Sequence, residues 1–167
     1  MVAMSTGFEA ARDATLDELT AAARAGDADR IVACFADDAE MVTAHGVYRG
    51  KEAIAGYWRW MCAGRSDADF REIGPGRLAC GDTVVREVIE SGRTAGVHYE
   101  VPVMACYAFD DTGQVLRLAA YSDQWALWKQ VAAQSHGVQG LILRSVVGML
   151  DKASSHDRPS PQTESPT

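Results

Sequence analysis

The most regular pattern of apolar and polar positions lies in the stretch from Tyr99 to Trp125. Alternate positions in its first half are almost wholly apolar, which predicts a strand with one face turned towards a core. The intervening positions, which include His98 and Glu100, form a more polar face that we expect to meet solvent. Turn residues at 110–113 then lead to a second apolar run, so the stretch predicts a β-hairpin with one apolar face. That face is formed by Tyr99, Val101, Val103, Ala105, Tyr107 and Phe109.

Helical spacing of apolar residues predicts three helices ahead of the hairpin. The first begins near Phe8 and ends at Gly26, a natural helix stop, and Asp27 then caps a short second helix. Asp37 and Asp38 are expected to break this second helix. A strand at 39–43 follows, and the third helix is predicted over 51–61.

Between the third helix and the hairpin, the chain reads as β-structure. A weak strand is predicted at 69–73, interrupted by Gly74-Pro75-Gly76 and resumed at 77–80. The β-branched run at 83–89 predicts a strong strand, and Ser91-Gly92-Arg93 is expected to turn the chain into the hairpin.

After Trp125 the apolar spacing becomes helical again, and it predicts a C-terminal helix over about 136–152. We expect this helix to pack near the mouth of a cavity or across a dimer contact. The Ser-, Pro- and Thr-rich segment 153–167 predicts a disordered tail.

Helices followed by antiparallel strands predict an α+β fold. A curved antiparallel sheet would wrap around the N-terminal helices and form a cone with a pocket at one end, and the C-terminal helix would be added to it. A chain of 167 residues favours a single domain, here residues 1–152 with a core at about 8–128.

Composition and charge exclude several classes of function. The net charge of -7 and the lack of a basic cluster argue against a nucleic-acid partner. No apolar run reaches the length of a membrane span, and the N-terminus lacks the features of a signal peptide, so we expect a cytoplasmic protein. The four cysteines are interpreted as free buried thiols in a reducing compartment. The histidines show no metal-ligand spacing and no glycine loop for phosphate is visible, so neither a metal nor an organic cofactor is expected.

Three segments resemble the nuclear transport factor 2-like superfamily, which includes SnoaL-like polyketide cyclases, ketosteroid isomerases and limonene-epoxide-hydrolase-like enzymes. They are GDADRIVACFADDAE at 26–40, YRGKEAI at 48–54 and FDDTGQV at 109–115, followed by Tyr-Ser-Asp at 121–123. The resemblance extends from about residue 16 to residue 128. It implies a cone-shaped fold with a pocket for a small molecule, and a homodimer formed through the outer face of the sheet.

The active sites of the superfamily do not carry over intact. The isomerase resemblance places Thr43 at the general-base aspartate, Leu19 at a tyrosine, and Ala105, or Met104 in a register shifted by one, at the oxyanion-stabilising aspartate. None of these side chains can do the work of the residue it replaces, so steroid isomerisation by that mechanism is disfavoured.

The epoxide-hydrolase pattern is also incomplete. Val88 lies at its arginine position and Glu90 replaces one of its two acids. Ala120 lies at the other acid, where SnoaL-like cyclases also have their catalytic aspartate. Asp123 follows three residues later and faces the other way unless a bulge intervenes.

Three residues are candidates for catalysis. If Arg86, Val88 and Glu90 face inward, Glu90 lies in an apolar cup where burial would raise its pKa and make it a general acid or base. The alternative is an inert acid in water at a strand end. Tyr107 is expected to supply a pocket hydroxyl, and Asp123 either orients a ligand or caps the following segment.

The expected substrate-binding residues are the aromatic and apolar side chains assigned to the pocket, although ordinary core packing is the alternative for the aromatic ones. They are His45, Tyr48, Tyr57, Trp58, Val88, Tyr99, Val103, Ala105, Leu118 and Ala120.

The leading hypothesis is a SnoaL-like enzyme of secondary metabolism, such as polyketide or antibiotic biosynthesis. It would cyclise or isomerise an apolar, polyketide-like small molecule, largely by pocket shape with weak acid–base assistance. One alternative is an acid–base enzyme of the epoxide-opening or dehydratase type. Another is a non-catalytic accessory protein that binds a small molecule.

Overall fold

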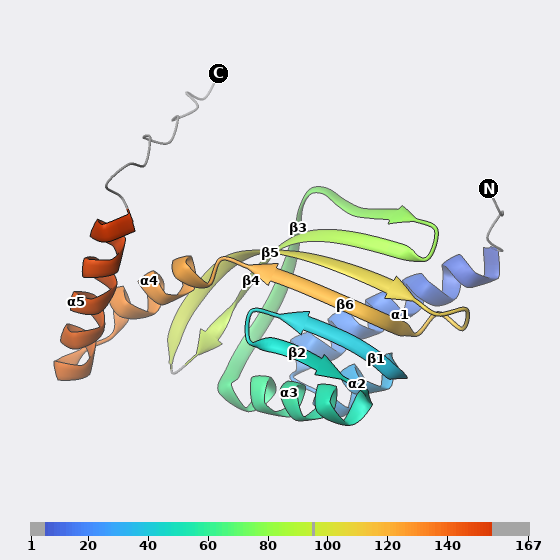
Figure 1. The fold of residues 1–167 in the computed structure, drawn as a ribbon, viewed down its shortest axis with the longest axis horizontal. Helices are drawn as coiled ribbons and strands as arrows, with labels where there is room; N and C mark the ends of the chain where they lie inside the picture. The colour runs from blue at the N-terminus through green and yellow to red at the C-terminus, as the bar shows by residue number, and fades with distance from the viewer. Residues whose placement is uncertain (1–5, 95, 155–167) are drawn as a thin grey trace, which may run out of the picture.

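The computed structural model describes residues 6–94 and 96–154. The elements are, in chain order, α1 (Thr6–Ala25), α2 (Ala28–Ala33), β1 (Phe35–Thr43), β2 (Gly46–Arg49), α3 (Lys51–Gly64), β3 (Arg65–Cys80), β4 (Thr83–Thr94), β5 (Val97–Phe109), β6 (Val115–Ser122), α4 (Gln124–Gln134) and α5 (Gly137–Ser154). Figure 1 shows this order along the ribbon, with α4 and α5 beyond one end of the sheet.

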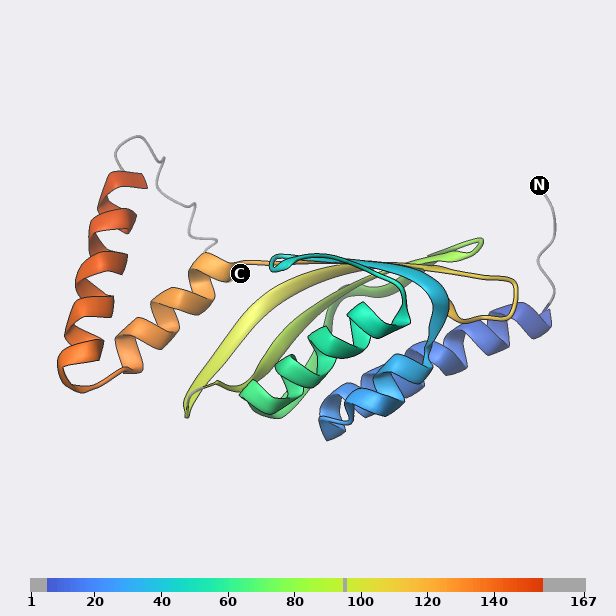
Figure 2. The same cartoon turned by 60° about the horizontal axis from the view of Figure 1, so that its bottom comes forward.

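The strands form one curved six-stranded sheet in the order β2-β1-β6-β5-β4-β3. Neighbouring strands are antiparallel except for β1 and β6, which run parallel. Helices α1, α2 and α3 cover the same face of the sheet, as Figure 2 shows. The predicted α+β class is confirmed, with one correction, because the sheet is mixed rather than wholly antiparallel.

The hairpin forms as predicted, from β5 and β6. Tyr99 and the alternate positions that follow it in β5 are buried, whereas His98 and Glu100 are exposed. At the turn, the Oδ1 atom of Asp110 accepts hydrogen bonds from the backbone N–H groups of Thr112 and Gln114, both at 2.9 Å. Gly113 has φ 84°, and its Cα faces the backbone of α1 so closely that a Cβ would lie 2.9 Å from the Ala11 Cβ. Glycine therefore meets both requirements of the turn.

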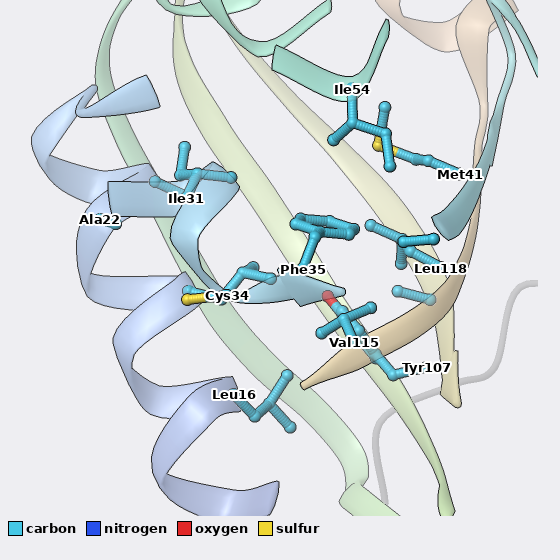
Figure 3. Close-up of a cluster of buried hydrophobic side chains, with 14 of the residues drawn as sticks. Leu16, Ala22, Ile31, Cys34, Phe35, Met41, Ile54, Tyr107, Val115 and Leu118 are labelled. Carbon is cyan, nitrogen blue, oxygen red and sulfur yellow. The ribbon is translucent and has the colours of Figure 1, made fainter. Parts of the chain in front are cut away.

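The core fills the space between the helices and the concave face of the sheet. Leu16 of α1, Ile31 of α2 and Ile54 of α3 are fully buried, as are Phe35 and Met41 of β1. Figure 3 shows these side chains converging from the helices and from β1, together with Tyr107 of β5 and Leu118 of β6. Burial of this apolar surface supplies the main driving force that holds the helices against the sheet.

Two predicted boundaries are wrong for physical reasons. Strand β1 begins at Phe35, and Asp37 and Asp38 lie within it as exposed residues where the register against β6 shifts. Strand β4 does not turn at Gly92 but continues to Thr94. A Cβ on Gly92 would lie 3.1 Å from the carbonyl oxygen of Ser66 and 3.2 Å from the Oη atom of Tyr99, so this glycine permits a close approach rather than a turn.

The two weak strands predicted around Gly74-Pro75-Gly76 are parts of one strand, β3. Its pairing with β4 shifts between Glu72 and Arg77, where Gly74 and Gly76 have φ values of 58° and 70°. The glycines therefore form an irregularity inside the strand and do not end it.

The C-terminal part contains two helices. Helix α4 packs on β5, where Gln130 donates to the Glu100 carbonyl oxygen and Gln134 to that of His98. Helix α5, near the predicted range 136–152, packs against α4. The tail predicted as disordered lies almost entirely outside the described residues. Among those described, no helix is long and apolar enough to cross a membrane.

The four cysteines are unpaired. Cys34 is buried, and Cys62 and Cys106 are half-buried, but Cys80 is exposed. The expectation that all four thiols are buried is therefore wrong for Cys80, which lies at the end of the outermost strand β3.

Candidate active site

A cavity of about 110 Å³ lies between the helices and the concave face of the sheet. Most of the predicted site residues line it, and they come from α3, β4, β5, β6 and the turn between β1 and β2. They are Glu90, Tyr107, His45, Tyr57, Trp58, Val88, Val103, Ala105, Leu118 and Ala120. An apolar cavity of about 150 Å³ holds benzene, so this one encloses at most about a single ring, and a larger ligand would extend beyond it towards the mouth.

Three predicted site residues do not line this cavity. Asp123 is the N-cap of α4, where its Oδ1 accepts a hydrogen bond from the backbone N–H of Ala126 at 2.8 Å, so its role is the capping alternative. The Tyr48 ring packs behind Tyr57, with ring centroids 4.8 Å apart. The Tyr99 hydroxyl donates a hydrogen bond to Glu90, which does line the cavity.

Strand β4 positions the polar groups of the site. Its alternating residues Arg86, Val88 and Glu90 are all buried and all line the cavity, so the solvent-exposed alternative for Glu90 is excluded. Val88 lies between the two ionisable groups, opposite Val103 of β5. The cavity therefore has two polar ends separated by an apolar wall.

Glu90 forms the first polar end. Its Oε1 atom accepts a hydrogen bond from the hydroxyl of Tyr99 at 2.9 Å and an ion-paired hydrogen bond from Nη1 of Arg65. The Arg65 guanidinium also lies over the Tyr99 ring, 5.5 Å from its centroid. The expectation of a lone acid in an apolar cup is thus wrong, because the buried carboxylate has a cationic partner from β3.

Tyr99 is a fixed hydrogen-bond donor in this cluster. Burial raises its pKa, and the negative charge of Glu90 acts in the same direction. The phenol therefore stays protonated and donates to Glu90 throughout the physiological range.

Arg86 forms the second polar end. Its Nη1 atom donates to the hydroxyl of Thr20 at 2.8 Å, and its Nη2 atom lies 3.1 Å from Oε1 of Glu72. Tyr107 lies beside this guanidinium, and burial raises the pKa of Tyr107 although the positive charge of Arg86 opposes the effect. Tyr107 is therefore a neutral hydroxyl next to a buried cation.

The mouth of the cavity is aromatic. His45 is exposed, and its ring centroid lies 6.0 Å from that of Tyr57 and 5.2 Å from that of Trp60. Burial raises the pKa of Tyr57, while its hydrogen bond with Thr43 opposes this. Flat ligands that enter here would pass between aromatic faces.

The positions that correspond to acids in other members of the superfamily face this cavity. Thr43, Ala105 and Ala120 all line it, whereas Met104 is 52% exposed on the opposite face of the sheet. Of the two positions that the isomerase resemblance left open, Ala105 is the one that faces the cavity. Among the described residues that line the cavity, Glu90 is the only carboxylate.

A second hollow of about 420 Å³ adjoins the first. The two share His45 and Arg65, and helix α4 contributes Trp128 to the second. Arg65 therefore stands between the site and a larger space in which the rest of an extended ligand would fit.

Sequence reasoning missed Arg65 and Thr20, and it named Arg86 only as a neighbour of Glu90. The period-two pattern of β4 contained the signal for Arg86. Arg65 follows α3 directly and lies 25 residues from its partner Glu90, and no local pattern marks that pairing. Among the described residues, no group of three or more His, Cys, Asp or Glu side chains is arranged to hold a metal ion.

Comparisons with known proteins place the fold. The family model of the SnoaL-like domain matches residues 16–118. No curated protein sequence matches the chain. Solved structures do match it, at identities that show a shared fold and no more.

One similar structure is a protein assigned as a SnoaL-like polyketide cyclase from Shewanella denitrificans, with 16% identity over 74% of this chain and 98% of the other, and a TM-score of 0.66. A phenazine biosynthesis-related protein from Pseudomonas aeruginosa has 15% identity over 83% and 91%, with a TM-score of 0.67. An epoxide hydrolase of the LEH-like type from M. tuberculosis has 19% identity over 83% and 97%, with a TM-score of 0.60. The chain therefore belongs to the SnoaL-like domain family, within the nuclear transport factor 2-like superfamily.

Proposed function

We propose that the protein is an enzyme of secondary metabolism that cyclises or isomerises a small, largely apolar, polyketide-like molecule. The observation that carries this proposal is the apolar cavity with a single buried carboxylate, Glu90, in its wall. A pocket of this kind holds a flexible molecule in one reactive shape. Orientation alone then lowers the activation barrier by several kcal/mol, roughly half of what a well-oriented intramolecular reaction gains.

Glu90 is suited to the role of general base. Its carboxylate would remove a proton from a carbon next to a substrate carbonyl and leave an enolate. Arg86 and the hydroxyl of Tyr107 would stabilise the negative charge on the enolate oxygen, because they present a cation and a neutral donor in a place removed from water.

Ring closure would follow from the same arrangement. The enolate carbon attacks a second carbonyl carbon of the same molecule, a carbon–carbon bond forms, and the resulting alkoxide takes back the proton held by Glu90. For an isomerisation, the proton returns to a different carbon. The Cα atoms of Arg86 and Glu90 are about 13 Å apart because they are four residues apart on one strand. The substrate must therefore conjugate the carbon beside Glu90 with the oxygen beside Arg86, so that charge formed at one end is stabilised at the other.

Epoxide opening is a second candidate, favoured by the Arg65–Glu90 pair. The epoxide-hydrolase pattern requires an arginine and two acids. The Arg65–Glu90 pair supplies the arginine, from β3 because Val88 occupies the aligned position, and one of the acids. Glu90 would then accept a proton from a water molecule as its oxygen attacks the epoxide carbon, and Tyr107 would protonate the opened oxygen.

Product mass separates these candidates. The purified full chain would be incubated with linear poly-β-ketone thioesters of N-acetylcysteamine and with cyclic epoxides, and the products analysed by liquid chromatography and mass spectrometry. Cyclisation or isomerisation leaves the substrate mass unchanged, epoxide opening adds one water, and dehydration removes one. A new product of unchanged mass supports the leading proposal, whereas binding without any product from either series contradicts an enzymatic role.

The variant Glu90→Gln tests the role of the carboxylate. If Glu90 is the general base, its removal lowers kcat/KM by roughly 10²–10⁴-fold. The matched control is Glu87→Gln, since Glu87 lies on the same strand but on the opposite face of the sheet. Equal activity of the two variants would leave shape alone as the source of the catalysis and would remove Glu90 from the mechanism.

A further inference from the structure

Two buried donors in the cavity wall lack hydrogen-bond partners among the residues that the structure describes. They are the Nε atom of Arg86 and the Nε1 atom of Trp58, and both side chains line the same cavity. Among the described residues, these are the two buried side-chain nitrogen or oxygen atoms without a hydrogen-bond partner. Buried polar groups in native proteins nearly always have partners, so two exceptions in one cavity indicate that a bound molecule completes them.

Both groups are N–H donors and neither can accept a hydrogen bond. A molecule that satisfies them must therefore carry two acceptors. Arg86 extends from β4 in the sheet, and Trp58 comes from α3, which covers the concave face of that sheet (Figure 2). The two donors therefore come from the sheet and from the helix layer that covers it, and a ligand with one acceptor towards each wall satisfies both.

The charges around the cavity indicate that these acceptors are neutral. Arg86 is already paired with Glu72, and Arg65 is paired with Glu90. Glu72 also pairs with Arg77, and Arg77 pairs with Asp17. The positive and negative charges of this network therefore cancel as well. A carboxylate or phosphate would add an uncompensated negative charge beside Glu90, whereas a carbonyl or ether oxygen would not.

We infer that the cavity binds a neutral ring compound with two separate oxygen acceptors, one for the Nε–H of Arg86 and the other for the indole N–H of Trp58. This inference rests on the proposed function for the choice of cavity, and it adds the substrate class. The acceptor on Arg86 is the carbonyl whose oxygen becomes the enolate oxygen. The acceptor on Trp58 fixes the other end of the molecule.

Three bicyclic probes of the same size test this inference. Chroman-4-one carries a carbonyl and a ring oxygen, 1-tetralone carries the carbonyl alone, and tetralin carries neither. Each would be titrated into the ¹⁵N-labelled full chain, and the indole N–H resonances followed by NMR. The chain has four tryptophans, and the signal of Trp58 is the one missing from Trp58→Phe.

We expect chroman-4-one to shift the Trp58 indole signal and tetralin to leave it near its free position. Trp58→Phe keeps an aromatic ring and removes the N–H donor. It should weaken the binding of chroman-4-one by roughly three- to tenfold and leave the binding of tetralin unchanged. Trp125→Phe is the matched control, because Trp125 lies on α4 and lines neither of the two hollows. Arg86→Lys keeps the charge, loses the Nε–H, and should weaken both carbonyl probes.

The outcomes separate the inference from the proposed function. If all three probes bind equally well and Trp58→Phe changes none of them, the inference is wrong while a ligand-binding cavity remains. If none of the probes binds, the cavity does not admit rings, and both the inference and the proposed function fall. Should Arg86→Lys fail to fold, the Trp58→Phe series still decides the question.

Discussion

Replacing Glu90 by Gln should destabilise the protein even without a substrate. The substitution keeps the size of the side chain and an acceptor for Tyr99, but it removes the negative charge that pairs with Arg65. The Arg65 side chain is only 22% exposed, so water replaces the lost partner poorly.

The cost follows from the hydrogen bonds and the burial. A hydrogen bond to a charged group contributes about 1.5–3 kcal/mol and a neutral one about 1 kcal/mol. The net loss for Glu90→Gln is therefore about 2 kcal/mol. Arg65→Met leaves the more deeply buried carboxylate unpaired, and we expect it to cost about 3 kcal/mol, near the lower limit for a buried pair.

Urea denaturation of both single variants and of the double variant measures these values and their coupling. We expect the double variant to be more stable than the sum of the single effects predicts, by about 2 kcal/mol, because each single change leaves the other charge unpaired. Glu87→Gln, on the outer face of β4, should change stability by no more than about 0.5 kcal/mol.

A coupling energy below about 0.5 kcal/mol would refute this reasoning, since exposed ion pairs give values of that size. Glu90 and Arg65 would then be solvated independently of each other, and the carboxylate would not be held in the geometry that the proposed general base requires.

Three further predictions concern other parts of the molecule. Asp110→Ala should cost about 1–2 kcal/mol at pH 7, where Asp110 is ionised, because it removes the acceptor of the hairpin turn. Burial would raise the Asp110 pKa, but hydrogen bonds from Thr112 and backbone amides lower it overall, so its contribution is present above about pH 4 and is lost as the pH falls through the folded-state pKa. Urea titrations at neutral and acidic pH should show the variant approaching the parent in acid. Burial raises the pKa of Cys34 to about 11. A disulfide reagent at mildly alkaline pH should therefore modify exposed Cys80 quickly and Cys34 only on unfolding. Rapid labelling of Cys34 in the native protein would contradict the structure. Met104 and Tyr121 are paired across β5 and β6 on the outer face and are 52% and 62% exposed, so we propose that this face forms a homodimer. Light scattering should find a dimer that Tyr121→Glu dissociates. A monomeric parent protein would exclude this interface.

Local patterns predicted most of the fold. The alternation in β5 identified its buried face correctly, and the stop at Gly26 and the cap at Asp27 set the boundary between α1 and α2. These features depend on residues that are neighbours along the chain, because strand and helix periods are local properties. The same period placed Arg86 and Glu90 on one face of β4.

Local patterns failed where a distant neighbour decides the structure. Gly92 is typical of a turn, but it lies inside β4 because Ser66 and Tyr99 approach its Cα too closely for a side chain. Asp123 fitted two roles from the sequence, of which the cap was favoured, and the start of α4 selected the cap.

The sequence by itself determined the family and the apolar faces, and it put Arg86, Val88 and Glu90 on one face of β4. Only the tertiary structure decided that this face is the inner one and what Glu90 and Arg86 contact. Glu90 meets Arg65 across 25 residues, and Arg86 meets Thr20 across 66. Such pairs form because burying the apolar faces brings remote segments together, and buried charges then need partners from whichever segment lies nearest.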